Sequence, residues 1–258
     1  YLYTNIDLYH RATYDMKTRP MLPDYVGNNA PTANVGRMLN MGIDFEAGYD
    51  RSFSLDRSIR IAGNVSYLRN EVVYLGNEGG YLPGQRWGPQ GLEITRIQEG
   101  LPIGYFFGYM ADGVFQNSAE VDAHINAEGG LLQPDAVAGD FRFKDVNNDG
   151  ILDADDRTII GNPTPDFAFG ATLNARFGGW DAVLFVQGVA GNQIYNATRR
   201  YDLPSANMNA SALDRWTGEG SSDHYARLTA LDKNTNFARS SSFYVEDGSF
   251  LRIKTAQI

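Results

Sequence analysis

The sequence predicts an all-β chain that forms part of an antiparallel transmembrane β-barrel, with about six strands and long extracellular loops. Two observations support this fold class: long segments in which apolar and polar residues alternate, and connections that are short and long in turn. A third is composition, since 28 glycines, 15 tyrosines and 14 phenylalanines among 258 residues favour strands and turns over helices. No run approaches the roughly 18 consecutive apolar residues of a membrane helix.

Six segments are predicted as strands, and the first four alternate most cleanly. They are longer than the five or six residues usual in soluble proteins, and close to the roughly 9 to 11 residues that cross a bilayer at a tilt. Because successive strand residues point to opposite faces, each segment has one apolar and one polar face. The predicted strands are 2–14, 40–50, 58–70, 166–177, 180–190 and 249–258.

The two faces of these strands are expected to meet different surroundings. In a barrel the apolar face meets lipid, and its aromatic residues gather in girdles at the membrane interfaces. Four aromatic residues suit such girdles: Tyr14, Tyr49, Tyr67 and Phe177. The polar face is expected to line a wet lumen with Asp7, Asp44, Glu46, Asn64, Asn174 and Arg176.

The connections indicate which strand ends lie together. Segments 51–57 and 178–179 are short, whereas 15–39, 71–165 and 191–248 are long and rich in Gly, Pro, Asn and Asp. If neighbouring strands are antiparallel, all short turns fall at one end and all long loops at the other, as in outer-membrane barrels. A soluble β-sandwich also alternates and carries long loops, so both architectures remain open; strand length and loop asymmetry favour the barrel.

The strand pattern runs from one end of the sequence to the other. Six strands cannot close around a pore, and an open sheet would leave two unpaired edges in hydrocarbon. We therefore expect a piece of a larger barrel.

Charge and cysteine content exclude several classes of function. The formal charge is −9 and no basic run occurs, so we expect no nucleic-acid partner. The chain has no cysteine, which excludes disulfide scaffolds, thiolate zinc sites and cysteine nucleophiles. His10, His124 and His224 lack metal-type spacing, and no catalytic or phosphate-loop motif is present, so we expect no enzyme.

The segment 145–156, DVNNDGILDADD, has the ligand spacing of a calcium-binding loop, with Gly150 at the sharp turn. Two features depart from the EF-hand: the twelfth residue is Asp rather than Glu, and the flanking residues are not helical in pattern. A solvated cluster of Asx turns without an ion is the alternative. The predicted ligands of a structural Ca²⁺ are Asp145, Asn147, Asp149, the backbone carbonyl of Ile151, Asp153 and Asp156.

Aromatic residues of the long loops are candidate ligand-binding groups, because a flat ring stacks on a sugar or peptide while its polar edge stays hydrated. For each of them, packing within the loops or contact with a lid protein is the alternative. The candidates are Tyr81, Trp87, Tyr105, Phe106, Tyr109, Tyr201, Trp216 and Tyr225.

The run GDFRFKDVNNDGILDADDRTIIGNPTPDFAFG (139–170) resembles the signature of the SusC/RagA family of TonB-dependent outer-membrane transporters, the glycan and peptide importers of Bacteroidetes. Segments that resemble the same family in the same order are DLYHRATYDM (7–16), NVGRMLNMGIDFE (34–46), NVSYLRNEVVYLG (64–76) and DGSFLRIKTAQI (247–258). The resemblance implies a 22-stranded barrel filled by an N-terminal plug, a SusD-like surface lipoprotein as lid, and energy delivered through the TonB complex.

On this resemblance, residues 1–258 are part of one receptor β-barrel domain, without the plug, and the loop 145–156 belongs to a long extracellular loop. The implied function is import of a nutrient oligosaccharide or peptide across the bacterial outer membrane. None of the matched motifs encodes the substrate. The alternative function is that of a secreted, calcium-stabilised β-domain that binds glycans, and it requires Ile43, Phe45, Phe167 and Phe169 to lie in a dry core.

Overall fold

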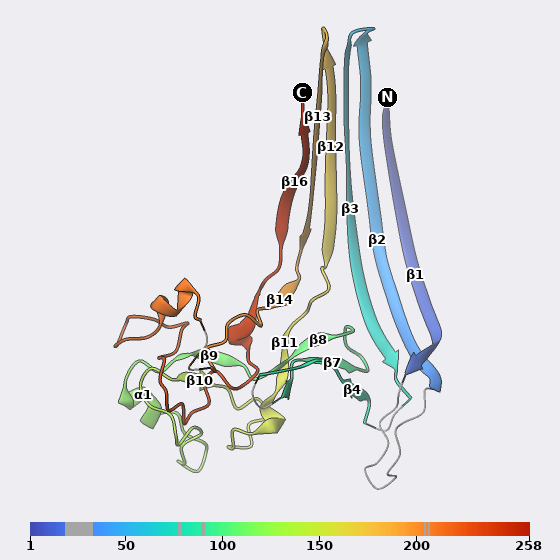
Figure 1. Ribbon diagram of the computed structural model, residues 1–258. Helices are drawn as coiled ribbons and strands as arrows, with labels where there is room; N and C mark the ends of the chain where they lie inside the picture. Colours follow the sequence, from blue (N-terminus) through green and yellow to red (C-terminus); the bar gives the residue numbers. More distant parts are fainter. Residues whose placement is uncertain (19–32, 77–78, 89–90, 204, 206) are drawn as a thin grey trace.

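The structure is a computed structural model that describes residues 1–18, 33–76, 79–88, 91–203, 205 and 207–258. It has two parts, a tall antiparallel sheet and a loop region folded against one end of it (Figure 1). The sheet order is β1-β2-β3-β12-β13-β16. The sheet strands are β1 (Leu2–Thr18), β2 (Ala33–Ser54), β3 (Arg57–Tyr74), β12 (Phe167–Phe177), β13 (Trp180–Ala190) and β16 (Phe250–Gln257).

All six predicted strands are confirmed, but β1, β2 and β3 are longer than expected. The predicted seven-residue turn 51–57 is wrong, because the β2–β3 ladder continues until Ser54 lies opposite Arg57. Only Leu55 and Asp56 form the turn. The period-two order simply continues through 51–54, where arginine and phenylalanine alternate with serine. The predicted loop 15–39 is likewise partly strand, and its residues 19–32 lie outside the described residues.

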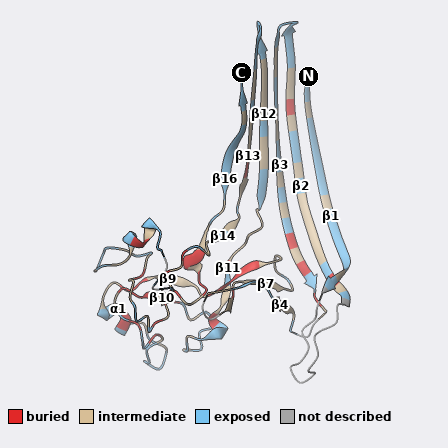
Figure 2. Cartoon of the chain, viewed as in Figure 1, coloured by how far each residue is buried: buried red, intermediate tan, exposed pale blue. Residues whose placement is uncertain are grey.

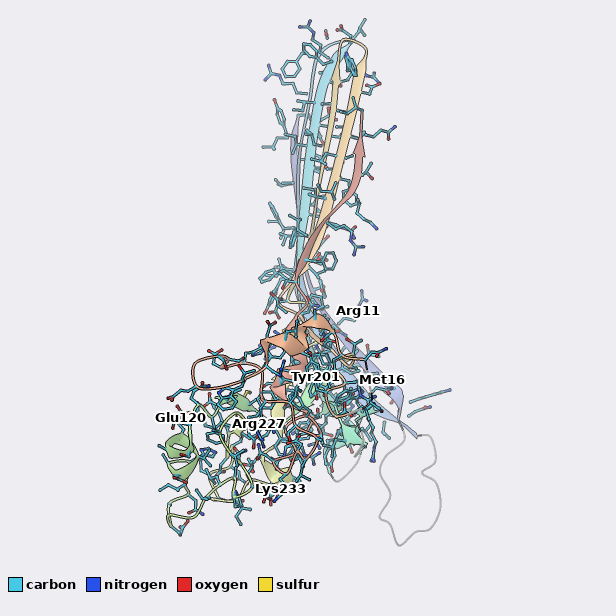
Figure 3. The ribbon with its side chains drawn as sticks, turned by 60° about the vertical axis from the view of Figure 1, so that its left-hand side comes forward. Arg11, Met16, Glu120, Tyr201, Arg227 and Lys233 are labelled. Atoms are coloured by element: carbon cyan, nitrogen blue, oxygen red, sulfur yellow. The ribbon has the colours of Figure 1, made fainter. Side chains whose placement is uncertain are left out.

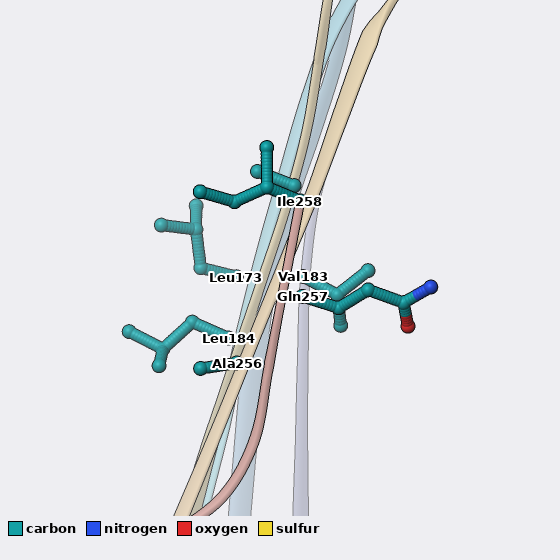
Figure 4. Close-up of a pocket in the computed structure, with 7 residues that line it drawn as sticks. Leu173, Val183, Leu184, Ala256, Gln257 and Ile258 are labelled. Carbon is teal, nitrogen blue, oxygen red and sulfur yellow. The ribbon is translucent and has the colours of Figure 1, made fainter.

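Strand register places most of the apolar residues of all six strands on one face. One cross-strand row joins Ile6, Phe45, Val65, Phe169, Gly188 and Leu251. A second joins Leu2, Tyr49, Ile61, Leu173, Leu184 and Ala256. Figure 4 shows Leu173, Leu184 and Ala256 on one side of the sheet, with Val183 and Gln257 pointing to the other. The face that carries these rows is called the apolar face below.

The two turns 55–56 and 178–179 lie at the same end of the sheet, at the top of Figure 1, and the long connections lie at the other end. The predicted asymmetry of the connections is confirmed. Within the described residues no helix is both long and apolar enough to span a membrane.

The long connections, predicted as irregular, contain several short elements. A four-stranded sheet has the order β11-β8-β7-β4, and three two-stranded pairs accompany it. The strands are β4 (Tyr81–Pro83), β5 (Arg86–Trp87), β6 (Leu92–Glu93), β7 (Thr95–Gln98), β8 (Tyr105–Gly108), β9 (Ala111–Val114), β10 (Phe141–Phe143), β11 (Thr158–Gly161), β14 (Gln193–Tyr195) and β15 (Val245–Asp247). The helical segments are α1 (Ser118–Asp122), η2 (Ala154–Asp156), η3 (Ala210–Asp214) and η4 (Ser242–Tyr244).

The hydrophobic core lies in the loop region. Figure 2 shows buried residues gathered there, while the sheet strands are mostly exposed or half-buried. Strands β14 and β15 continue from β13 and β16, so the loop core is attached directly to the sheet. The largest core cluster is built from Val114, Phe141, Phe143, Tyr201, Ala212, Ala226, Phe237, Phe243 and Tyr244.

Candidate functional site

The apolar face of the sheet is open to its surroundings rather than covered by a second layer of the described chain. Ile43 is 46% exposed, Phe45 39% and Phe167 45%. Phe169 is half-buried, because its ring lies over Gly188 of the neighbouring strand. A β-sandwich would bury these side chains against a facing sheet. The dry core that the secreted-domain alternative requires is therefore absent from the described residues.

Aromatic residues stand at both ends of the apolar face. At the turn end, Phe177 and Trp180 are opposite one another in the β12–β13 register. At the loop end, the rings of Tyr67 and Phe167 lie 5.3 Å apart. Between these borders the exposed side chains are aliphatic or aromatic except for Thr4 and Arg51, which is close to the pattern of a lipid-facing wall with aromatic girdles.

The opposite face of the sheet is polar. Asp7 lies directly opposite Asp44, and the neighbouring row places Asn5 opposite Glu46. The hydroxyl of Tyr3 donates a hydrogen bond to Glu46 Oε1 at 3.2 Å. Towards the turn end the carboxylates form ion pairs instead. Arg60 pairs with Asp50 and Arg176 with Asp181, each with an N···O distance of 2.8 Å. Asn64 lies opposite Glu46 and Asn174 opposite Arg60, so all six residues predicted to line the lumen lie beside another polar side chain on this face.

The acidic loop 145–156 is held in its turn by its own carboxylates. Asp145 Oδ2 accepts a hydrogen bond from the Gly150 backbone N–H at 2.8 Å. Gly150 has φ of 84°, a left-handed conformation that glycine adopts without strain. Asp156 is fully buried, and its two carboxylate oxygens accept from the N–H groups of Val146 and Asp153, both at 2.8 Å. This carboxylate closes the loop from its far end.

The other predicted calcium ligands lie near the surface of the same loop. Asn147 Oδ1 accepts from the Asp149 N–H, and Asp149 Oδ1 accepts from the Ile151 N–H. Asp145 Oδ1 is buried without a hydrogen-bond partner in the described structure. The side chains of the loop offer carboxylate and amide oxygens, which are the ligand atoms that calcium prefers. Among the described residues, however, no three carboxylate or imidazole side chains are arranged to hold a metal ion.

The eight candidate ligand-binding aromatics lie in the loop region, and three of them are buried: Tyr105 at 1% exposure, Phe106 and Tyr201. The Tyr105 hydroxyl donates to Gln98 Oε1 at 2.7 Å, and burial raises the pKa of this phenol to about 12. Four more are half-buried against the main core cluster: Trp87, Tyr109, Trp216 and Tyr225. Ligand contact by these residues stays a prediction, and packing accounts for where seven of the eight lie.

Arginine side chains are interleaved with these rings. The Arg96 guanidinium lies over Tyr81, the eighth candidate, at 4.3 Å and over Phe107 at 3.5 Å. Arg200 lies over Trp87 at 5.3 Å and pairs with Asp202. Such stacking fixes the rings in place and keeps the arginines partly hydrated at the surface of the loop core.

A buried polar network was not anticipated from the sequence. Asp140 is fully buried, and its Oδ1 accepts from Arg227 Nε at 2.7 Å and from Asn236 Nδ2 at 2.9 Å. Asn236 in turn accepts from the Phe141 N–H, and Gln133 contacts the same β-strand through Phe143. Figure 3 shows Arg227 and Tyr201 together in the loop region. The network ties three distant loop segments to β10, and no local pattern signals it.

The three histidines occupy separate places. His10 is exposed on β1, and His224 lies against Tyr225. A ring nitrogen of His124 is 3.1 Å from the Phe143 carbonyl oxygen, and burial lowers the pKa of this imidazole. They form no joint site in the described structure.

Comparison with known proteins gives the chain its family context. It is 27% identical to TonB-dependent receptor P26 of Formosa agariphila over its whole length, and 29% identical to TonB-dependent receptor P3 of the same organism over 97% of its length. It is 25% identical to TonB-dependent receptor SusC of Bacteroides thetaiotaomicron over 96% of its length. The chain is SusC/RagA-like. It spans about a quarter of the length of these relatives, covering 25%, 24% and 23% of them.

Solved structures agree on the fold of this SusC/RagA-like chain. The RagAB peptide importer in its open-open state matches with a TM-score of 0.71 at 20% identity, covering 98% of this chain and 25% of that one. The RagAB peptide transporter matches with a TM-score of 0.68 at 21% identity, covering 98% and 26%. No protein-family model matches the sequence. These structures therefore show that the six-stranded sheet has the fold of a partial antiparallel β-barrel, as the sequence predicted.

Proposed function

We propose that the protein containing this chain imports a nutrient, an oligosaccharide or a peptide, across the bacterial outer membrane in a TonB-dependent manner. In this proposal the chain is part of the receptor's β-barrel domain, with the sheet in the membrane and the loop region on the extracellular side. The observation that carries the proposal is the open apolar face, whose cross-strand rows run through all six strands. A surface of this kind is stable in hydrocarbon and costly in water.

The barrel's partner in this proposal is a SusD-like surface lipoprotein that closes over the loop region. Two similarities support it, one to a receptor named SusC and one to the RagAB importer. The TonB complex would act through a part of the protein outside this chain. Some loop aromatics, such as Tyr81 and Trp87, remain half-exposed. We propose these rings as the groups of this chain that contact the substrate or the lid protein.

Chemical conversion of the substrate forms no part of the proposal. The matched relatives are named receptors, and the matched structures are named as an importer or a transporter. The buried ionisable groups of the loop region are engaged in packing and hydrogen bonding, as Asp140 and Asp156 are. The substrate would therefore cross unaltered.

We also propose a structural Ca²⁺ in the loop 145–156. Support comes from the ligand spacing, from the left-handed Gly150 and from the unpartnered Asp145 Oδ1. Calcium would replace hydrogen bonds within the loop with coordination by Asp145, Asn147, Asp149, the carbonyl of Ile151, Asp153 and Asp156. Calorimetry on the full-length protein with and without Asp149→Ala tests this. Asp135→Ala, an exposed carboxylate outside the loop, is the matched control.

The import proposal is tested in a strain that lacks the gene for the full-length protein. Cells complemented with the wild-type gene should take up a labelled oligosaccharide or peptide mixture, and should lose that uptake when TonB is deleted. Cell fractionation gives the second measurement, since the protein should appear with the outer membrane. A protein found wholly in the soluble fraction, or uptake unaffected by both deletions, would contradict the proposal.

A further inference from the structure

The acidic side chains of the sheet are divided unequally between its two faces, whereas basic side chains lie on both. By strand register, the acidic residues gather on the polar face as Asp7, Asp44, Glu46, Asp50 and Asp181. The ionisable side chains of the apolar face in the described strands are His10, Arg37, Arg51, Arg57, Arg69 and Glu71. Because the whole chain carries a charge of −9, a basic apolar face does not follow from composition.

These basic residues stand at the borders of the apolar face. At the loop end, the last wide apolar row joins Leu8, Ile43, Tyr67 and Phe167, and the next row joins His10, Met41 and Arg69. One such step is about 7 Å along a strand. The headgroup layer outside a bilayer's hydrocarbon core is also about 5 to 7 Å deep on each side. Arg69 and His10 therefore lie at the depth of lipid headgroups.

Arg37 lies further from the apolar rows, held between two tyrosine rings. Its guanidinium is 5.7 Å from the Tyr14 ring centre and 5.9 Å from that of Tyr74. Two aromatic neighbours place the positive charge on the outer surface of the sheet without neutralising it.

Pairing differs between the two faces. On the polar face Arg60 and Arg176 each pair with a carboxylate at 2.8 Å. Arg37 and Arg69 are exposed, and neither has an ion pair or hydrogen-bond acceptor among the described residues. Glu71 lies in the row between them and forms no ion pair with either in the described structure. Two unpaired guanidinium groups next to a lipid-facing surface leave room for an external anion.

We propose that Arg37, Arg69 and His10 bind the phosphate-bearing headgroups of lipids in the leaflet on the loop side of the barrel. The inference rests on the proposed function, which places the sheet in a membrane. A guanidinium offers paired N–H donors that match phosphate oxygens, and the tyrosine rings supply an interfacial contact for the same lipid. The lipid tails then lie along the apolar rows, so one molecule meets both parts of this surface.

The test uses the full-length protein in nanodiscs of phosphatidylcholine with a minor fraction of phosphatidic acid. Native mass spectrometry after release counts the phosphatidic acid that stays bound. The double variant Arg37→Gln with Arg69→Gln should retain it about thirtyfold more weakly, since each basic residue near the surface contributes about fivefold. Glu71→Gln should strengthen retention, because it removes the acidic side chain of this border.

The control double variant Arg11→Gln with Arg252→Gln removes the same charge from the polar face and should leave retention unchanged. Equal retention by wild type and by Arg37→Gln with Arg69→Gln, or an equal fall in the control, would overturn the inference. Displacement of the lipid by the same concentration of inorganic phosphate would overturn it too, because the site would then take free phosphate. Wild-type protein that fails to enter nanodiscs at all would instead contradict the proposed membrane location.

Discussion

The sheet and the loop region use the same residue types in opposite ways. In the sheet, Phe167, Phe177 and Trp180 are exposed, whereas in the loop region Phe141, Phe143 and Tyr244 are almost completely buried. In the proposed membrane location, apolar area leaves water in both cases, against lipid in the first and against the chain itself in the second. The comparison teaches that exposed aromatic side chains mark the face of the sheet proposed to meet lipid, whereas the core of the loop region buries its aromatic side chains.

The two regions also treat polar groups differently. Buried polar groups must be hydrogen-bonded, and the loop region meets this need through long-range contacts such as those of Asp140. The sheet satisfies its backbone through the strand ladders and keeps its side-chain polarity on one face. Substitutions should therefore act through packing and burial in the loop region, and through transfer to lipid in the sheet.

Removal of a core ring should give the largest effect. Phe141 packs against Phe237 and Phe243, with ring centres 5.5 and 4.9 Å away. Phe141→Ala should destabilise the loop region by about 3 to 5 kcal/mol, because it leaves a cavity. Unfolding of the full-length protein in detergent, followed by tryptophan fluorescence, measures the loss. Phe177→Ala on the sheet is the comparison, and an equal loss there would break the distinction between the regions.

A charge placed on the apolar face should give the next largest effect. Leu173→Arg should destabilise the inserted barrel by about 2 to 4 kcal/mol, since the guanidinium would meet hydrocarbon near the middle of the face. Thr172→Arg, on the polar face of the same strand, should be tolerated. The folded fraction in lipid vesicles, read from the gel mobility of unheated samples, measures both. Equal tolerance of the two would contradict the assignment of faces.

Breaking the buried network should cost somewhat less. Asp140→Ala removes the carboxylate acceptor of Arg227 and one of the two acceptors of Asn236, and we expect a loss of about 2 kcal/mol because the arginine is partly hydrated. Limited proteolysis of the loop region should then show earlier cleavage around Arg227. Asp135→Ala removes a nearby exposed carboxylate and should leave the cleavage pattern as in wild type.

Alkaline pH should give the smallest effect. Burial raises the pKa of Tyr105 from 10.0 to about 12, so the folded state holds its proton more firmly than the unfolded state does. The neutral phenol therefore stabilises the fold fully below pH 10, and this contribution is lost as pH rises towards 12. Burial also raises the pKa of Tyr195 and Tyr244, so ultraviolet titration of tyrosinate should show Tyr105→Phe lacking one of the late-titrating groups of wild type. A Tyr105 that titrates with the exposed tyrosines would show that the ring is accessible.

Strand positions were predictable because alternation is a local signal. Residues 58–70 show it plainly, and the register with 166–177 follows from matching apolar faces. The first residues of β2 were missed because Asn34, Gly36 and Arg37 interrupt the pattern, and pairing with β1 and β3 holds them in the sheet. The sharp turn at Gly150 in the acidic loop was also predictable, and Gly150 takes the left-handed conformation that such a turn requires.

The interior of the loop region was not predictable from the sequence. Asp140 and Asn236 are 96 residues apart in the chain, and nothing in either neighbourhood indicates the other. The candidate aromatics show the same limit: Tyr105 and Tyr201 have the composition expected of binding residues, and their burial depends on distant segments. Period and spacing are local properties, whereas burial in this region is a property of the assembled loops.

The central claim is that the apolar face of the sheet meets lipid. The chain contains no cysteine, so single cysteines can be introduced along β12 and labelled with a nitroxide in the full-length protein. In lipid bilayers, labels at Phe169, Ala171 and Leu173 should be accessible to oxygen and shielded from a water-soluble nickel complex. Labels at Ala168, Gly170 and Thr172 should lack this lipid signature. The account would be contradicted if oxygen accessibility did not alternate between the two sets of labels. It would also be contradicted if the labels at all six positions were shielded from both reagents.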